Sequence, residues 1–390
     1  MAHLNELATA LLDEVGPNRS AAGVVMSSRW RAPDDGKVYP PTFPVDGPSR
    51  YLYEKRHVPG ESEPREVVVL DQPASQANRV EAALLEARDE GRIRLPLFVL
   101  RASTTDGERR LTSLEFPHRF ADAYLRDSEL DGVLFAKTTP GARLRETTSN
   151  DVRPLFERSP ESLVFGSWDS HRKGRSVKFP RVFSSSMIGW DPQIGQRAGG
   201  KMDPFNLTGA VKDSAVTEGD WEFSATGEAK KKGAKLSELG HSNIAPSLDH
   251  GGVSITRADR SGWLSLSGLQ RLRFGDAPRE TAWLARATLA AMAVAGDRLA
   301  FDHPSVWLRS GCDLVRTTDT IGFERATGEV NPLQVSADEA IAAFHALRDR
   351  TAEAGIVMAQ DTIELTPTAG LANAIEYATT RAQADEAGEE

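Results

Sequence analysis

An α+β fold with a mainly antiparallel sheet is predicted by the order of apolar patterns along the sequence. Short apolar runs typical of strands and amphipathic runs typical of helices interleave without a regular strand–helix–strand repeat. A polar segment rich in Gly, Lys, Asp and Ser spans residues 191–250 and lacks apolar periodicity. The chain has 390 residues, 39% hydrophobic and 26% charged, which is enough for a large core. We therefore predict one elaborated domain over residues 1–390, from which residues 191–250 project as a flexible insertion.

Local patterns predict the elements of the N-terminal half. Apolar residues recur at helical spacing from Leu4 to Val15, which predicts a first helix. Residues 28–65 are polar and contain seven prolines, each of which fixes φ and removes a donor, so an irregular insertion is expected there. The following elements are then expected: strands at residues 66–70, 95–100 and 133–136, and helices at 76–89 and 118–125.

The C-terminal half is interpreted in the same way. Residues 162–168 (SLVFGSW) are expected to form a strand, and residues 182–190 its return. Two strands, 253–256 and 263–266, are expected around a turn at residues 259–262. The remaining expectations are a buried helix at 281–295, a strand at 306–315, an amphipathic helix at 338–354 and an acidic disordered tail at 382–390.

Composition limits the classes of function. The sequence has no apolar run of about 18 residues and its start lacks a secretory pattern, so we expect a cytoplasmic protein with no membrane partner. The net charge is −9, yet residues 161–309 hold 20 Lys and Arg against 16 Asp and Glu, a net +4. This asymmetry permits a site for a polyanion on an acidic protein.

Enzyme and metal motifs are weak. The segment GQRAGGKM (residues 195–202) has phosphate-loop spacing, but Met202 replaces the Ser or Thr that ligates magnesium, and no apolar strand leads into it. His241, His250 and Asp249 have no characteristic ligand spacing, and ordinary surface positions fit them better. The single cysteine, Cys312, fits a packing role better than that of a nucleophile. We expect no cofactor, no metal and no catalytic residue.

The most informative segment is WDSHRKGRSVKFPR, residues 168–181, in a window without acids from Ser170 to Trp190. Cations can neutralise the phosphates of a nucleic acid. Aromatic rings can stack on the bases of a single strand, which contributes roughly 1–3 kcal/mol per base. An alternative is that the aromatic residues are core and the cations line a solvated loop, and a strand would divide the set between two faces. The candidate RNA-binding residues are Trp168, Ser170, His171, Arg172, Lys173, Arg175, Lys178, Phe179 and Arg181.

A second candidate site is the start of the helix that follows the strand at residues 66–70. The sequence DQPASQANRVEAAL places Gln76, Asn78 and Arg79 there, and free amides at a helix N-terminus favour an anion. Simple capping by Ser75 is the alternative. The insertion adds four cations that can contact phosphate: Lys201, Lys230, Lys231 and Lys232.

Four segments together resemble a known family: VLDQPASQANRVEAAL, SPESLVFGSWDSHRKGRSVKFPRVFSSSMIGWD, LSLSGLQRLRF and VWLRSGCDLV. In this order, from about residue 66 to 350, the chain resembles the backbone subunit of type I-G (formerly I-U) CRISPR effector complexes, the Cas-seven group of the RAMP superfamily. The SQANR and FGSWDS…KFPR…IGWD parts are the most specific.

The resemblance implies a modified RRM-like, ferredoxin-type palm with inserted finger and thumb elements, with residues 191–250 as the thumb candidate. It implies a non-catalytic protein that stacks head to tail with further copies along CRISPR guide RNA, beside other subunits of the effector complex. The guide then pairs with target DNA, so sequence is read by base pairing. The alternative is a RAMP-type endoribonuclease that cuts CRISPR or target RNA with a loop aspartate, for which Asp169, Asp191 and Asp249 are candidates. A third possibility, an enzyme that binds a nucleotide through Lys201, rests on the phosphate-loop spacing alone.

Overall fold

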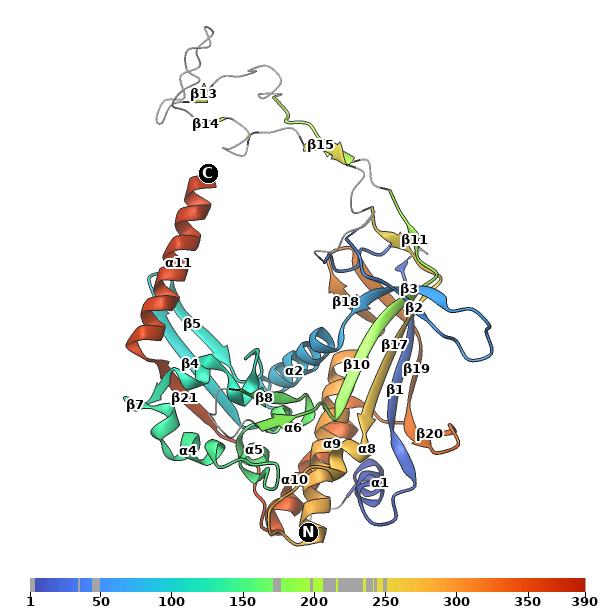
Figure 1. Ribbon diagram of the computed structural model, residues 1–390, viewed down its shortest axis with the longest axis vertical. Helices are drawn as coiled ribbons and strands as arrows, with labels where there is room; N and C mark the ends of the chain where they lie inside the picture. Colours follow the sequence, from blue (N-terminus) through green and yellow to red (C-terminus); the bar gives the residue numbers. More distant parts are fainter. Residues whose placement is uncertain are drawn as a thin grey trace.

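A large antiparallel sheet forms the centre of the fold (Figure 1). The computed structural model describes residues 4–33, 36–43, 50–170, 177–196, 199–205, 215–216, 234–235, 241, 244–247 and 251–389, and no side chains in 381–389. The strand order is β18-β19-β1-β17-β10-β3-β2, with β20 beside β19. These strands are β1 (Ala21–Arg31), β2 (Tyr53–Arg56), β3 (Arg65–Asp71), β10 (Phe183–Trp190), β17 (Arg257–Ser265), β18 (Ser305–Arg309), β19 (Cys312–Arg325) and β20 (Val330–Pro332).

The four strands β19-β1-β17-β10 are all antiparallel neighbours. In the chain, α2 (Pro73–Asp89) precedes β10, and α9 (Arg279–Phe301) lies between β17 and the hairpin of β18 and β19. This order of strands and connecting helices is consistent with the expected RRM-like palm, and the α+β class is confirmed. The central strand β1 was not predicted, because its second half, Ser28–Arg31, is polar and was assigned to the irregular insertion.

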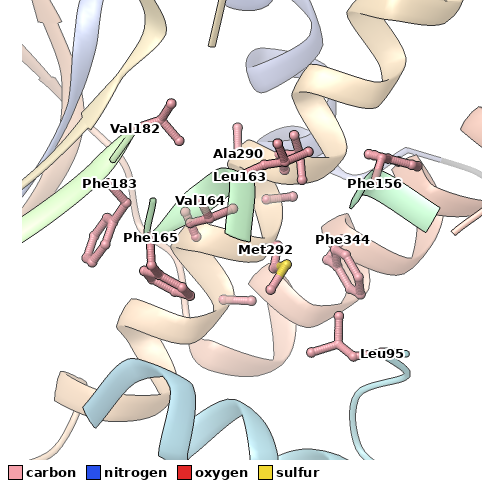
Figure 2. Packing of buried hydrophobic residues seen from close by; sticks show 14 of the residues in the cluster. Leu95, Phe156, Leu163, Val164, Phe165, Val182, Phe183, Ala290, Met292 and Phe344 are labelled. Atoms are coloured by element: carbon pink, nitrogen blue, oxygen red, sulfur yellow. The ribbon is translucent and has the colours of Figure 1, made fainter. Parts of the chain in front are cut away.

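A layer of helices covers the sheet, with α9 at its centre. It packs against α1 (Glu6–Val15), α2 and α10 (Ala337–Glu353). Seven consecutive residues of α9, from Leu289 to Ala295, are fully buried, and Gly296 has no space for a side chain because an added Cβ would lie 2.6 Å from Val80. Small residues therefore let α2 approach α9 closely. Figure 2 shows Phe165, Phe183, Met292 and Phe344 in this core.

A second, smaller sheet has the order β5-β4-β21-β6-β7. Its strands are β4 (Leu97–Thr104), β5 (Gly107–Thr112), β6 (Ser128–Leu130), β7 (Val133–Leu134) and β21 (Thr362–Pro367). The pairing of β4 with β21 is parallel. The helix α11 (Ala369–Glu389) packs against β4 and β21. Its last residues fall in the range that was predicted to be a disordered tail, and the structure has them helical. Within the part of the chain that the structure describes, no helix combines the length and apolar character needed to cross a membrane.

Several predicted elements differ from the structure. Residues 161–164 are helical (α6, Glu161–Val164), followed by the short strand β8 (Ser167–Asp169), so the predicted strand 162–168 is largely wrong. Residues 257–265 form one continuous strand, β17, where two strands and a turn were expected. The expected strand at 306–315 is a hairpin of β18 and β19. The helix expected at 118–125 is divided into a 3-10 turn (Arg119–Ala121) and α3 (Ala123–Arg126).

The remaining described elements connect these layers or extend from them. The helices α4 (Thr139–Arg145), α5 (Arg153–Arg158) and α8 (Leu266–Gln270) and the 3-10 turn Phe135–Lys137 lie between the strands in sequence. Two short antiparallel pairs, β11 (Gln193–Ile194) with β16 (Val253–Ser254) and β12 (Gly199–Lys201) with β15 (Ile244–Ser247), extend beyond the end of the large sheet (Figure 1). A third pair joins β13 (Ala215–Val216) to β14 (Ala234–Lys235).

Candidate nucleic-acid interface

The basic-aromatic segment forms a β-hairpin. Strand β8 pairs antiparallel with β9 (Val177–Phe179), so that Trp168 lies directly opposite Lys178. The Lys178 Nζ atom lies 5.5 Å from the centroid of the Trp168 ring. Both side chains are exposed, and Trp168 has a relative exposure of 58%. The outer face of the hairpin therefore carries one ring and one cation, side by side, and Ser170 follows them at an exposed position.

The other face of the hairpin belongs to the core. Val177 and Phe179 are buried, and Phe179 has a relative exposure of only 6%. The predicted stacking of a base on Phe179 is therefore wrong for this structure, because its ring is enclosed by the hydrophobic core. The two-residue period of a strand divides the predicted set between two faces, as expected for a strand.

Arg181 follows the hairpin and is exposed. Its Nε atom donates a hydrogen bond to the carbonyl oxygen of Phe165 at 3.2 Å, which fixes the base of its side chain. The four cationic or titratable residues at the centre of the predicted window, His171, Arg172, Lys173 and Arg175, lie outside the described residues. Their contacts with RNA stay a prediction.

A buried ion pair joins the hairpin to α2. Arg119 donates to both carboxylate oxygens of Glu81, at 2.7 and 2.8 Å, and to the carbonyl oxygen of Gly166 at 2.9 Å. Gly166 has φ of +85° immediately before β8, a conformation that favours glycine. Because the Arg119 and Glu81 side chains have exposures of only 11% and 3%, this contact holds the start of the hairpin against α2 in a region with little water.

A second buried carboxyl, that of Glu161, lies in the same region. Burial raises its pKa to about 8, and the negative charge of Glu81 contributes in the same direction. The Ser159 hydroxyl donates a hydrogen bond to Glu161. Burial also raises the pKa of Glu81, although Arg119 opposes this effect. A pKa of about 8 favours the protonated form of the Glu161 carboxyl at neutral pH.

The start of α2 differs from the predicted anion site. The helix begins at Pro73 after the N-cap residue Gln72, and no side chain caps it, so capping by Ser75 does not describe it. Gln76 has no exposed surface. Its amide nitrogen donates to Asp71 at 2.6 Å, and its amide oxygen accepts from Ser185 and Arg260 at 3.0 and 2.8 Å. Gln76 therefore has an internal role, which corrects its predicted contact with RNA.

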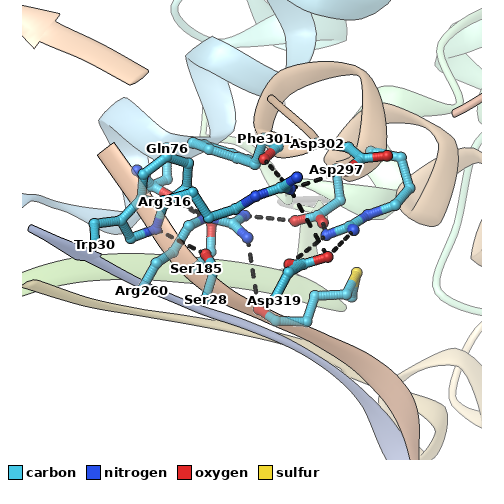
Figure 3. A network of polar contacts seen from close by, with 12 residues as sticks. Ser28, Trp30, Gln76, Ser185, Arg260, Asp297, Phe301, Asp302, Arg316 and Asp319 are labelled. Carbon is cyan, nitrogen blue, oxygen red and sulfur yellow. Dashed lines mark hydrogen bonds and ion pairs between the residues drawn. The ribbon is translucent and has the colours of Figure 1, made fainter. Parts of the chain in front are cut away.

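Gln76 belongs to a network of buried charges that joins the sheet to the helices (Figure 3). The guanidinium of Arg260 on β17 pairs with Asp297 on α9 and lies 3.6 Å from the centroid of the Phe301 ring. Arg298 donates to Asp297 at 3.0 Å and to Asp319 on β19 at 2.6 Å. Arg260 and Arg298 each have an acidic partner, so the network stabilises the palm and leaves neither charge for a ligand.

The two neighbours of Gln76 in the predicted site have different surroundings. Arg79 pairs with Asp71 at 2.7 Å and donates to the carbonyl oxygen of Leu308 at 2.7 Å, with 28% of its side chain exposed. Asn78 is exposed and lines a cavity of about 700 Å³ together with four carboxylates, Glu86, Asp89, Glu90 and Glu115. An acidic cavity repels phosphates, which argues against Asn78 as a contact to the RNA backbone.

One exposed aromatic residue was not predicted as part of the interface. Trp307 lies on the edge strand β18 with a relative exposure of 65%, and Arg79 donates to its carbonyl oxygen at 3.4 Å. The sequence VWLR does not reveal this exposure, because an apolar strand is expected to be covered on at least one face. The neighbouring residues Val306 and Leu308 are half-buried and buried, so the ring of Trp307 lies on the other, uncovered face of the strand.

The other candidates from the sequence are only partly described. Lys201 lies on β12, opposite Ile244, and its side chain is not described. A strand at this lysine is incompatible with a phosphate loop, in which a helix begins there. Lys230, Lys231 and Lys232 lie outside the described residues, as do His250 and Asp249.

Two further candidates of the enzyme hypotheses are described. Asp191 pairs with Arg65 and accepts from Thr256 at 2.8 Å, and the bond to Arg65 lowers its pKa. Burial raises the pKa of the Cys312 thiol to about 12, which keeps it protonated. Among the described residues, no group of three or more His, Cys, Asp and Glu side chains is placed to hold a metal ion.

A comparison with protein families gives one match. Residues 31–193 match the family described as CRISPR-associated protein GSU0053. The match supports a CRISPR-associated protein. The matched range includes Gln76, the Arg119–Glu81 pair and the hairpin of β8 and β9. No curated protein matches the chain. A CRISPR-associated role thus agrees with the resemblance noted in the sequence.

Proposed function

We propose that this chain is a backbone subunit of a type I-G CRISPR surveillance complex, which binds guide RNA independently of sequence and presents it for pairing with target DNA. The observation that carries the proposal is the exposed Trp168–Lys178 pair on the hairpin, at the edge of a window that contains five further cationic or titratable side chains. A ring and a cation on one face suit a single strand, since the cation contacts phosphate and the ring supports a base.

Several further features support a structural subunit. Arg79 on α2 pairs with Asp71, and Arg260 on β17 pairs with Asp297 on α9, so these charges stabilise the palm. The proposal includes a filament made with further copies of the chain, other subunits of the complex, and the segment 191–250 as the thumb. It also includes a non-catalytic role, since Asp191, one of the three aspartates considered for RNA cleavage, is committed to Arg65.

The proposal is tested by RNA affinity at several salt concentrations. The protein with Arg172, Lys173, Arg175 and Lys178 replaced by Ala should bind unrelated single-stranded RNAs more weakly, and its salt dependence should be less steep. The single variant Lys178→Ala should reduce the slope of log K against log salt by about 1. The control is Lys137→Ala, which removes an exposed lysine on the 3-10 turn that follows β7. Unchanged affinity and slope in the quadruple variant would contradict the proposal.

The ribonuclease alternative needs a separate assay. Purified protein is incubated with labelled guide precursor, with and without magnesium. Intact RNA in both conditions supports the backbone role. Specific cuts that disappear when a single aspartate is replaced would favour the enzyme. The RNA that copurifies with the protein adds an independent measurement, because a backbone subunit should retain short RNA of uniform length.

A further inference from the structure

A basic cavity lies between α8, the start of α9 and the segment that connects them. It has a volume of about 650 Å³ and is lined by Arg273, Arg279, Arg286, Phe274, Trp283 and Asn150, among others. Small-molecule sites have volumes of about 300–1,000 Å³. The cavity shares no residue with the hairpin of β8 and β9. It is therefore a second place at which this acidic protein concentrates cations and aromatic rings.

The charge of this cavity is unbalanced. Three arginines line it and no carboxylate does. Within the described part of the chain, no ion pair involves Arg273, Arg279 or Arg286, whereas nearby Arg153 pairs with both Asp151 and Asp276. Like charges that converge without a counterion raise the free energy of the unoccupied site, and a bound anion relieves this repulsion.

The guanidinium of Arg286 is held in place by the protein. It donates two hydrogen bonds to the carbonyl oxygen of Leu272, at 3.2 and 2.7 Å, and lies 5.9 Å from the centroid of the Phe274 ring. Burial lowers the pKa of Arg286, and the positive charge of Arg273 lowers it further. The charge of Arg273 therefore acts on Arg286. Because the Arg286 guanidinium is already fixed by its hydrogen bonds, it loses little conformational entropy when a ligand binds.

The other walls of the cavity are also fixed. The amide nitrogen of Gly275 donates to the carbonyl oxygen of Asn150 at 2.9 Å, and that of Val152 donates to the carbonyl oxygen of Arg273 at 2.8 Å. These bonds tie the segment before α9 to the segment before α5. On α9 itself, the Arg279 guanidinium lies 5.7 Å from the centroid of the half-buried Trp283 ring. The result is a preformed site with cations on several sides and an apolar wall.

We propose that this cavity binds the phosphate of a nucleotide, with Arg273, Arg279 and Arg286 as the phosphate ligands and the half-buried Trp283 ring as the wall beside the nucleoside. Guanidinium groups bind phosphate through charge-assisted and bidentate hydrogen bonds. The same chemistry is present in a free nucleotide and in a phosphorylated strand end. The proposal stands independently of the guide-RNA role, because it rests on different residues.

The test is titration calorimetry on the full chain with adenosine 5′-monophosphate, adenosine, and one short oligoribonucleotide prepared with a 5′-phosphate or a 5′-hydroxyl group. We expect saturable, phosphate-dependent binding that falls about tenfold or more in Arg273→Gln and in Arg279→Gln. The matched control is Arg271→Gln, because Arg271 is exposed and adjacent to the cavity but does not line it. All variants are compared by thermal unfolding to establish that they are folded.

The outcomes separate the two sources of phosphate. Binding of the monophosphate alone supports a free nucleotide, and binding of the 5′-phosphorylated strand alone supports a strand end, provided that both arginine variants lose it. The proposal is overturned if the wild type binds neither phosphate ligand more tightly than the folded double variant Arg273→Gln/Arg279→Gln. The variant Lys178→Ala should keep the binding of the monophosphate, so failure of the hairpin as an RNA site and failure of this cavity are distinguishable.

Discussion

Trp168 and Lys178 face each other across a two-stranded hairpin, with the ammonium group 5.5 Å from the centroid of the ring. A cation–π contact at an exposed site is worth about 0.5–1 kcal/mol. The contact therefore favours the arrangement in which the ring stays beside the ammonium group. Val177 and Phe179, the residues before and after Lys178 on β9, lie on the opposite face, in the core. The hairpin thus separates a surface role from a packing role by one position.

The first prediction compares the two aromatic residues of this hairpin. Phe179→Ala should reduce the free energy of unfolding by about 3–5 kcal/mol, because it removes a buried ring from the core. Trp168→Ala should change it by no more than about 0.5–1 kcal/mol, since the ring is exposed and contributes mainly its contact with Lys178. Urea denaturation measures both values.

RNA affinity, unlike stability, should depend on the exposed ring of Trp168. Trp168→Ala should weaken the binding of single-stranded RNA by roughly 1–3 kcal/mol if one base stacks on the ring. The control is Tyr377→Ala, which removes an exposed aromatic side chain on α11. Equal affinities of Trp168→Ala and this control would show that no base rests on Trp168.

The second prediction concerns the ion pair at the base of the hairpin. Glu81→Gln should destabilise the protein by about 3–5 kcal/mol, because it leaves the largely buried guanidinium of Arg119 without its counterion. The comparison is Glu108→Gln, which breaks the surface pair with Arg101 and should cost no more than about 1 kcal/mol. Similar losses in the two variants, measured by urea denaturation, would mean that the Arg119–Glu81 pair is not effectively buried.

The parts of the fold that could be predicted are those whose pattern is local. The helix α10 has its complete signal within four residues, a capping box in which Ser336 and Glu339 satisfy each other's backbone groups. The strand β3 is a continuous apolar run, and α9 is a long run of buried small residues. In each case the residues that determine the element lie within the element itself.

The parts that could not be predicted depend on distant partners. The sequence of β17 contains Arg260 and Gly262, which are typical of a turn. Arg260 is nevertheless buried, because Asp297 on α9 neutralises its charge and Gln76 on α2 accepts a hydrogen bond from it. Similarly, β1 ends in polar residues, yet Ser28 is buried, and its partners across the sheet are Arg260 on β17 and Asp319 on β19. Periodicity cannot reveal such a partner, since it lies far away in sequence.

The same reason explains the mixed outcome at the candidate site. Composition identified Trp168 and Lys178, and both are exposed as an interface requires. It also selected Gln76 and Phe179, whose residue types suit RNA, although burial removes both from any ligand. Residue type indicates what a side chain can bind. Only tertiary packing determines whether the side chain is accessible.

The third prediction tests the internal role of Gln76. Gln76→Ala should lower the free energy of unfolding by at least about 2 kcal/mol, because it leaves buried groups of Arg260, Ser185 and Asp71 without a partner. Asn78→Ala, two positions away on the same helix and exposed, should change it by no more than about 0.5 kcal/mol. If both variants were as stable as the wild type but bound RNA more weakly, the segment would be an RNA contact after all.

The fourth prediction uses the raised pKa of Glu161. Its carboxyl has a pKa of about 8 in the folded protein, against a usual value of 4.5. Between these values the folded state binds a proton that the unfolded state has released, so the contribution of Glu161 to stability is fully present below about pH 4.5 and is lost as the pH rises to about 8. The variant Glu161→Gln cannot lose this proton. Its stability relative to the wild type should therefore increase with pH, by up to about 1.4 kcal/mol per pH unit.

Urea denaturation of Glu161→Gln and the wild type at a series of pH values between about 5 and 9 measures this difference directly. The difference should grow over the lower part of the range and become constant above about pH 8, where the wild-type carboxyl is ionised in both states. Glu81 titrates in both proteins, so taking the difference removes most of its contribution. A stability difference that does not change with pH would show that the Glu161 carboxyl is already ionised in the folded protein, and that the base of the hairpin is more open to water than its burial indicates.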